Sequence, residues 1–228
     1  LIDQVGGEVQ SRICENTVAV DAKQQLLLPG FIESHAHLLF GSMFNFGDIQ
    51  LLGDANNTDD VVKMLTEYKD KHSADHPVIG LGAGYFDPPM TRQILDQVAT
   101  NQTVVYASYD LHTMWANTYA LEKAGILEVP EDKRKYIEAD DKGLAIGILR
   151  EAEAYTPVAP QMGILTAALG HRILRMSIDD PNVPDLNDPA LRAEIKEMLA
   201  KGFEEYPKHG VTTVHSMDGD RQVLALFD

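Results

Sequence analysis

The sequence is poor in cysteine, in positive charge and in long hydrophobic runs. Cys14 is the only cysteine among 228 residues, so a disulfide within the chain and a cluster of thiolate metal ligands are both excluded. A chain with so little cysteine suits a reducing compartment, and we expect a cytoplasmic protein. No stretch reaches the ~18 consecutive apolar residues of a membrane span, so no membrane partner is expected.

Acidic residues outnumber basic residues by 35 to 19, and the formal net charge is −16. This charge would repel a phosphate backbone, so nucleic acid is not an expected partner. Hydrophobic residues make up 44% of the chain, which is enough to bury a substantial core. The length allows one large domain, or one domain and part of a second.

The hydrophobic pattern changes near residue 29. Residues 1–27 show short alternating segments and turns, which predict β-structure. From Phe31 onward apolar segments alternate with helical ones, and this alternation predicts a parallel sheet with crossover helices. The expected strands lie at 77–85, 103–110, 144–151 and 211–219, and the expected helices at 58–72, 91–99, 115–126 and 188–210. Loops that could build a substrate site are expected at 40–57 and 126–143.

Two of these helices carry clear end and face signals. The first is predicted to begin with Thr58 as its N-cap, and it places Val61, Leu65 and Tyr68 on one apolar face. The long helix near the C-terminus is predicted to begin with Asp188 as its N-cap.

Two histidines stand at the end of an apolar run, in the segment LLLPGFIESHAHLLFG (residues 26–41). In a strand, residues i and i+2 share a face, so His35 and His37 should point the same way. Two imidazoles at the end of a strand can hold one divalent cation. Two solvated histidines at a strand end are the other interpretation, and the spacing alone does not decide between them.

The residues around this pair resemble the first metal motif of the amidohydrolase superfamily, Pro-Gly-Phe-[Ile/Leu]-[Asp/Glu]-x-His-x-His. The match comprises Pro29, Gly30, Phe31, Ile32, Glu33, His35 and His37. Three later segments resemble motifs of the amidohydrolase 3 branch, the YtcJ-like group: DLHTMWANTYALEKAGI (110–126), GLAIGILRE (143–151) and GVTTVHSMDG (210–219). Four motifs in the family's order are more specific than any one of them.

This resemblance implies a (β/α)8 TIM barrel fold. Residues 1–28 would be the remnant of a small N-terminal β-sandwich domain, and residues 29–228 would hold the first five barrel strands. The superfamily's sixth-strand His and its eighth-strand Asp, the usual general base, would lie beyond Asp228. We therefore expect a fragment whose open sheet edges require the C-terminal half of the barrel.

The resemblance also implies a set of metal ligands. His35 and His37 would be ligands from the first strand. Glu151, at the end of the fourth strand, would replace the carboxylated lysine that many superfamily members place there, and His215 would be a ligand from the fifth strand. Each of the last two has a simpler interpretation, because Glu151 could be an exposed residue at a helix start and His215 a polar residue at a strand end.

His112 carries no metal role in the superfamily. It is expected to contact substrate or a developing oxyanion, together with Trp115 and Asn117, and a purely structural role stays equally open. The remaining histidines in polar surroundings are interpreted as solvated: His72, His76, His171 and His209.

Members of this family hydrolyse C–N and related bonds through one or two divalent metals. The expected function is therefore metal-dependent hydrolysis of an amide-like bond in a small-molecule substrate, with zinc as the expected metal. A catalytically inactive barrel that acts as a binding or regulatory protein is the first alternative. A metal-independent α/β enzyme is the second, and the four ordered motifs disfavour it. A homo-oligomer stays open.

Overall fold

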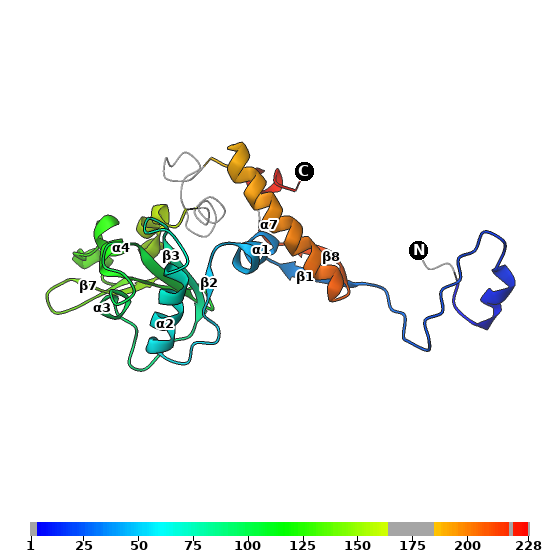
Figure 1. Cartoon of the computed structure of the whole chain (residues 1–228), viewed down its shortest axis with the longest axis horizontal. Coiled ribbons are helices and arrows are strands. Elements are labelled where there is room, and N and C mark those ends of the chain that lie inside the picture. The colour runs from blue at the N-terminus through cyan, green and yellow to red at the C-terminus, as the bar shows by residue number, and fades with distance from the viewer. Residues whose placement is uncertain (1–3, 164–184, 219–220, 228) are drawn as a thin grey trace.

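The computed structural model describes residues 4–163, 185–218 and 221–227. His171 therefore lies outside the described residues. The described chain forms two separate sheets, each with its own helices, and residues 4–30 extend away from them at the right of Figure 1. None of the described helices combines the length and the apolar character that a membrane crossing requires.

The strands are β1 (Phe31–Ala36), β2 (Gln50–Leu51), β3 (Val78–Ala83), β4 (Val104–Ser108), β5 (Thr113–Ala116), β6 (Ile137–Ala139), β7 (Ala145–Arg150) and β8 (Val211–Ser216). The α-helices are α1 (Leu38–Phe46), α2 (Thr58–Lys69), α3 (Arg92–Leu95), α4 (Thr118–Lys123), α5 (Glu151–Tyr155), α7 (Pro189–Lys208) and α8 (Arg221–Leu224). Short 3₁₀-helices occupy η1 (Gly7–Arg12), η2 (Glu131–Lys133) and η3 (Thr156–Gln161). The expected strands and helices are thus largely confirmed, although α1, β2 and β6 lie where loops were expected and β5 occupies the start of the helix expected at 115–126.

The larger sheet is mixed rather than parallel. Its strand order is β2-β3-β4-β5-β7-β6, and only the β2/β3 and β3/β4 pairs are parallel. The β4/β5, β5/β7 and β6/β7 pairs are antiparallel. The prediction of a wholly parallel sheet is therefore wrong, because the link from β4 to β5 is a short loop and a parallel return would need a long crossover.

The smaller sheet brings the two ends of the described fold together. β1 pairs in parallel with β8, from Phe31 opposite Val211 to Ala36 opposite Ser216. Among the described strands β1 and β8 pair only with each other, and β2, which follows β1 in the chain, pairs only with β3. No strand of the described chain therefore belongs to both sheets. The described chain is a mixed α/β fold, and the closed arrangement of a TIM barrel is not found in it.

The N-terminal segment differs from its prediction. The described residues 4–30 contain no strand, and Val18 and Val20 are 86% and 84% exposed. An alternating pattern forms a strand only where another strand supplies its hydrogen bonds and something covers its apolar face. No described segment does either here, so the expected β-structure of residues 1–27 does not form within the described chain.

The buried hydrophobic side chains of the described chain form two clusters. On one face of the larger sheet α2 and α3 bury a cluster that includes Val61, Leu65 and Tyr68, which confirms the predicted face of α2. Residues of α1, α4, α5 and α7 belong to a second cluster, in which α7 packs on α1 and β8 beside the smaller sheet. Asp188 caps α7 as predicted, but α2 is capped by Asn57, whose side chain accepts the backbone N–H of Asp60.

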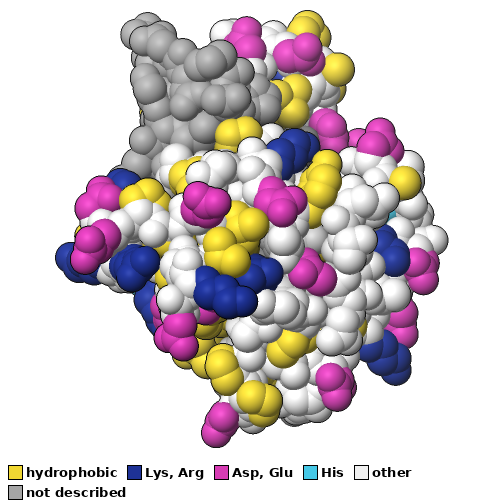
Figure 2. Space-filling model, turned by 90° about the vertical axis from the view of Figure 1, so that its left-hand side faces the viewer, with side chains coloured by type: hydrophobic (Ala, Val, Ile, Leu, Met, Phe, Trp, Pro, Cys, Tyr) yellow, Lys and Arg dark blue, Asp and Glu magenta, His cyan; other side chains and the backbone are white. Residues whose placement is uncertain are grey.

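Helices α1 and α7 pack closely against each other beside the smaller sheet. Gly202 of α7 lies directly against Ser42 of α1, and a Cβ at this position would come within 1.9 Å of the Ser42 hydroxyl oxygen. A residue without a side chain is therefore required at this crossing. Figure 2 shows the end of the molecule that carries the larger sheet, where acidic and basic side chains are interspersed without a continuous patch of either sign among the described residues.

Candidate metal centre

His35 and His37 lie together at the C-terminal end of β1. His35 belongs to the strand, and His37 is the N-cap residue of α1. Their ring centroids are 5.6 Å apart, and the ring planes are nearly perpendicular. At this separation the two imidazoles can reach one cation. Both residues are exposed, so an ion in solvent has access to them.

A buried carboxylate forms a hydrogen bond with the imidazole of His37. Nδ1 of His37 is 2.7 Å from Oδ1 of Asp218, whose side chain is only 1% exposed. Oδ2 of Asp218 accepts the backbone N–H groups of Leu39 (2.6 Å) and Phe40 (3.2 Å). A carboxylate only accepts, so Nδ1 of His37 donates, and in the neutral ring Nε2 keeps a free lone pair.

Asp218 also caps the N-terminus of α1. His37 makes no capping hydrogen bond with its own side chain, and Asp218 satisfies the first free N–H groups of α1 instead. The parallel pairing of β1 and β8 brings it there, because Met217 donates its N–H to the carbonyl of Ala36 at 2.6 Å. Sequence reasoning missed this residue. The available signal was a carboxylate directly after a strand that was expected to end in a metal ligand.

His215 lies on β8, the strand that neighbours β1. It is exposed, and a register irregularity between Glu33 and Ala36 falls where β1 passes alongside it. His215 thus lies on the strand next to the one that carries His35, and its role as a ligand stays a prediction.

His112 and Glu151 form a second pair at the end of the larger sheet. Nδ1 of His112 lies 3.2 Å from both carboxylate oxygens of Glu151, and the backbone N–H of Glu151 donates to the carbonyl of His112 at 2.9 Å. Both side chains are more than half exposed. Leu111 and Glu151 have positive φ values of 62° and 63°. Such conformations cost ~1–3 kcal/mol each in residues other than glycine, and they cluster at functional sites.

The predicted ligands are therefore distributed over two places. His35 and His37 share one strand end with His215 nearby, whereas Glu151 pairs with His112. No three of the four predicted ligands have donor atoms within 4.8 Å of one another among the described residues. The four-residue ligand set stays a prediction.

Trp115 and Asn117 do not accompany His112. Trp115 is buried and stacks on Tyr106, with centroids 4.5 Å apart and planes 7° apart. Asn117 is fully buried and caps α4. Trp115 and Asn117 therefore have structural roles, whereas His112 and Asp110 of the same motif are exposed.

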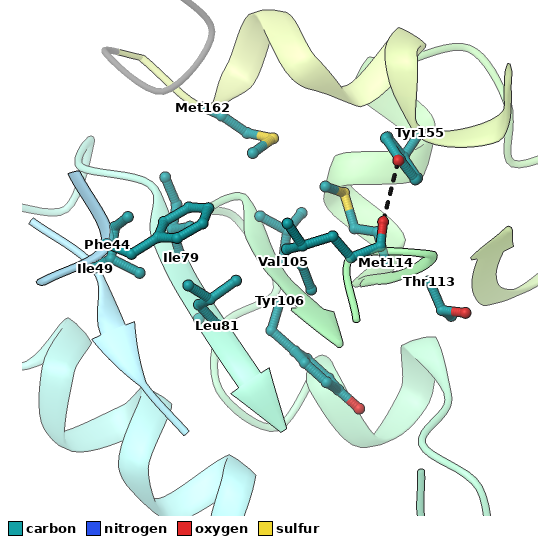
Figure 3. A pocket seen from close by; sticks show the side chains of 13 residues that line it. Phe44, Ile49, Ile79, Leu81, Val105, Tyr106, Thr113, Met114, Tyr155 and Met162 are labelled. Atoms are coloured by element: carbon teal, nitrogen blue, oxygen red, sulfur yellow. Dashed lines mark hydrogen bonds between the residues drawn. The ribbon is translucent and has the colours of Figure 1, made fainter. Parts of the chain in front are cut away.

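An apolar pocket opens on the sheet face beside this pair (Figure 3). Its walls come from β3, β4 and β5, with Phe44 of α1 and Met162 closing its sides. Leu111 and Thr113, which flank His112 in sequence, line it, and Tyr155 donates its hydroxyl to the carbonyl of Leu111 at 3.2 Å. Its cavity volume is about 50 Å³, well below the ~300–1,000 Å³ of ligand pockets, so it has room for one small apolar group only.

Comparison with known proteins identifies the family. Residues 18–227 match the model of the amidohydrolase family, Amidohydro_3. The chain belongs to this family. Among curated proteins, the exoenzymes regulatory protein AepA of Pectobacterium carotovorum subsp. carotovorum is 28% identical over 154 residues, which cover 64% of this chain and 33% of that protein. The amidohydrolase chain described here thus spans about a third of the length of this relative.

Two solved structures are similar to this amidohydrolase chain, and both are uncharacterized metal-dependent hydrolases. The one from Pyrococcus horikoshii OT3 is 18% identical, with a TM-score of 0.49 over 87% of this chain and 33% of its own. The one from Pyrococcus furiosus is also 18% identical, with a TM-score of 0.47 over 87% of this chain and 34% of its own.

Proposed function

We propose that this chain supplies part of the metal centre of a hydrolase that cleaves a C–N (amide-like) bond in a small-molecule substrate. One observation carries the proposal. The buried carboxylate of Asp218 holds Nδ1 of His37, which leaves Nε2 available beside the imidazole of His35. Histidines that ligate metals are commonly oriented by a carboxylate in this way. Membership of the amidohydrolase family supports the same function.

The predicted ligands suit a divalent metal by their chemistry, and zinc is the metal we propose, although Glu151 lies beside His112 and not beside the histidine pair. His35 and His37 would supply imidazole nitrogens, His215 a third nitrogen from β8, and Glu151 a carboxylate oxygen. Imidazole and carboxylate groups are the usual ligands of catalytic zinc. When bound, such a metal would polarise a substrate carbonyl and activate water at neutral pH.

The chain's own residues have distinct tasks in this proposal. Asp218 fixes the orientation and the proton position of His37. His112 gives Nδ1–H to Glu151, which leaves Nε2 to contact the substrate next to the apolar pocket. A carboxylate has two oxygens and several lone pairs, so Glu151 can hold His112 and also ligate a metal.

The test of this function is metal dependence. The full-length protein purified without chelator is expected to hold one or two divalent ions at this centre, and to hydrolyse members of a panel of N-acyl and cyclic amides. Chelation should abolish the hydrolysis, and zinc should restore it. A protein that contains no divalent metal and takes up no added zinc would contradict the proposal.

A second candidate function is binding or regulation without hydrolysis. The similar protein from Pectobacterium is named a regulatory protein. The exposed histidine pair with its buried carboxylate weighs against this candidate, because a scaffold does not require them. Tight zinc binding without hydrolysis of any tested amide would favour it.

The Asp218→Asn variant should bind zinc about 10–100-fold more weakly than the wild type. Asparagine keeps the shape, but its single neutral oxygen can accept either from the N–H groups of α1 or from Nδ1 of His37, and not from both. A chelator competition titration would measure the dissociation constant of zinc at this centre. The relevant binding event is the one that is absent in the His37→Ala variant. Asp54→Asn, at an exposed carboxylate, is the matched control and should change nothing. Equal affinities in both variants would show that Asp218 serves only the helix.

A further inference from the structure

Three side chains able to bind metal meet beside α2, away from the proposed hydrolase centre. Asp48 lies between α1 and β2, His72 follows the end of α2, and His76 precedes β3. One ligand atom from each lies within 4.8 Å of the other two. The polar sequence around both histidines predicts solvated side chains. In the structure each of them faces Asp48 instead.

The carboxylate of Asp48 faces two imidazole nitrogens at once. Nε2 of His72 is 3.0 Å from one of its oxygens, and Nε2 of His76 is 3.3 Å from the other. The two rings stack, with centroids 4.5 Å apart and planes 19° apart. Both histidines therefore present the same nitrogen to the same carboxylate.

Hydrogen bonding on the far side of His72 decides which nitrogen carries its proton. Nδ1 of His72 is 2.7 Å from the backbone carbonyl oxygen of Tyr68, and a carbonyl oxygen only accepts, so Nδ1 donates. In the neutral ring, Nε2 then directs its lone pair at a carboxylate oxygen 3.0 Å away. Two acceptors in this position repel each other unless a positive charge lies with them. A proton on Nε2 of His72 would supply that charge, and so would one metal ion, whose ligands would be the three groups that lie within 4.8 Å of one another.

Tyr68 holds the carboxylate in place from the core side. Tyr68 itself is buried, and its hydroxyl lies 2.9 Å from both the backbone oxygen and Oδ1 of Asp48. Burial, and next the hydrogen bond to Asp48, raise the pKa of Tyr68. The phenol donates to Asp48, because carbonyl and carboxylate oxygens only accept, and it also lies 3.1 Å from Nε2 of His76. Side chains of the two histidines are 23% and 30% exposed, so an ion can reach them from solvent.

We propose that Asp48, His72 and His76 form a second metal site, for a divalent transition metal such as zinc. Two imidazole nitrogens and one carboxylate oxygen are a ligand set that zinc, cobalt, nickel and copper accept, with water in the remaining position. The site is independent of the proposed hydrolase function, because it shares no residue with that centre.

The role of this second site is structural. Its ligands come from the α1–β2 connection, the end of α2 and the approach to β3. Edge strand β2 has only two residues and pairs with β3 alone among the described strands, so few ladder hydrogen bonds join the connection that carries Asp48 to the sheet. A metal bound there would fasten this connection to α2, and it should raise the Tm because it binds the folded state only.

The test uses cobalt as a probe in a variant without the other histidine pair. The full chain carrying His35→Ala and His37→Ala is freed of metal and titrated with Co²⁺. We expect one equivalent to bind, with visible absorption bands and a rise in Tm. Adding His76→Ala should weaken binding by more than about 100-fold, beyond the 10–100-fold range of outer-shell changes, and should remove the Tm rise.

His209→Ala, at an exposed histidine after α7, is the matched control and should leave Co²⁺ binding unchanged. Asp48→Asn serves as the second variant if His76→Ala does not fold. It keeps an acceptor for Tyr68 and removes only the anionic oxygen, and it should weaken binding at least about 10-fold. The proposal is overturned if the His35→Ala, His37→Ala protein binds no Co²⁺. It is also overturned if affinity is the same with and without Asp48 and His76. Neither result depends on hydrolytic activity, so failure here is distinct from failure of the proposed function.

Discussion

The His35→Ala, His37→Ala double variant is expected to lose the metal of the proposed hydrolase centre and all metal-dependent hydrolysis, while it remains folded. Both side chains are exposed, so their removal creates no cavity in the core. Asp218 keeps two of its three hydrogen bonds, those from the N–H groups of Leu39 and Phe40. The expected loss of activity is therefore a loss of ligands and not of structure.

Elemental analysis, activity and thermal unfolding would be compared in the double variant and the wild type. The comparison is made in a His76→Ala background, so that metal bound beside Asp48 is not counted. His209→Ala in the same background is the control and should retain both metal and activity. A double variant with undiminished metal content in this background would mean that His35 and His37 are two solvated histidines at a strand end.

The Asn117→Ala variant should be strongly destabilised, although its side chain contacts no proposed ligand. Nδ2 of Asn117 donates to the carbonyls of Ala99 and Gln102, both at 2.9 Å. Its Oδ1 accepts the N–H groups of Val104 (3.2 Å) and Ala120 (3.0 Å). Alanine would leave these four backbone groups without their partner in a site that is fully buried. An unsatisfied buried group costs ~1–3 kcal/mol, so we expect a loss of about 4 kcal/mol or more.

Such a loss is a large part of the ~5–15 kcal/mol by which domains are stable. Urea unfolding, with the midpoint and the m-value both fitted, would measure it. Asn101→Ala, at an exposed asparagine close in sequence, is the matched control and should stay within about 0.5 kcal/mol of the wild type. A change below about 1 kcal/mol in Asn117→Ala would mean that water replaces the amide, and that the site is less closed than its burial indicates.

Much of the local structure follows from the residue pattern. The apolar face of α2, with Val61, Leu65 and Tyr68, and the cap of α7 at Asp188 are both confirmed. Periodicity and capping act within a few residues, so the sequence carries them directly. Even here a neighbour can compete, since Asn57 and not Thr58 caps α2.

The arrangement of the strands could not be predicted in the same way. The sequence contains strands β3, β4, β7 and β8 at nearly the expected places, but their pairing depends on the links between them. The short link after β4 reverses the chain and makes the β4/β5 pair antiparallel, as are the two strand pairs beyond it. The N-terminal alternation predicted strands that do not form in the described residues, because no described strand pairs with them.

Some residues of the candidate site could be predicted from the sequence, and others could not. His35 and His37 could be singled out from a nine-residue motif, because both lie within three residues at the end of β1 and the pattern needs no distant segment. Asp218 could not be, since it reaches His37 only through the pairing of β1 with β8. Asp48 likewise meets His72 and His76 only because the α1–β2 connection lies against the end of α2. Sequence patterns determine which side chains face the same way along one element, whereas contacts between distant segments exist only once the backbone has folded.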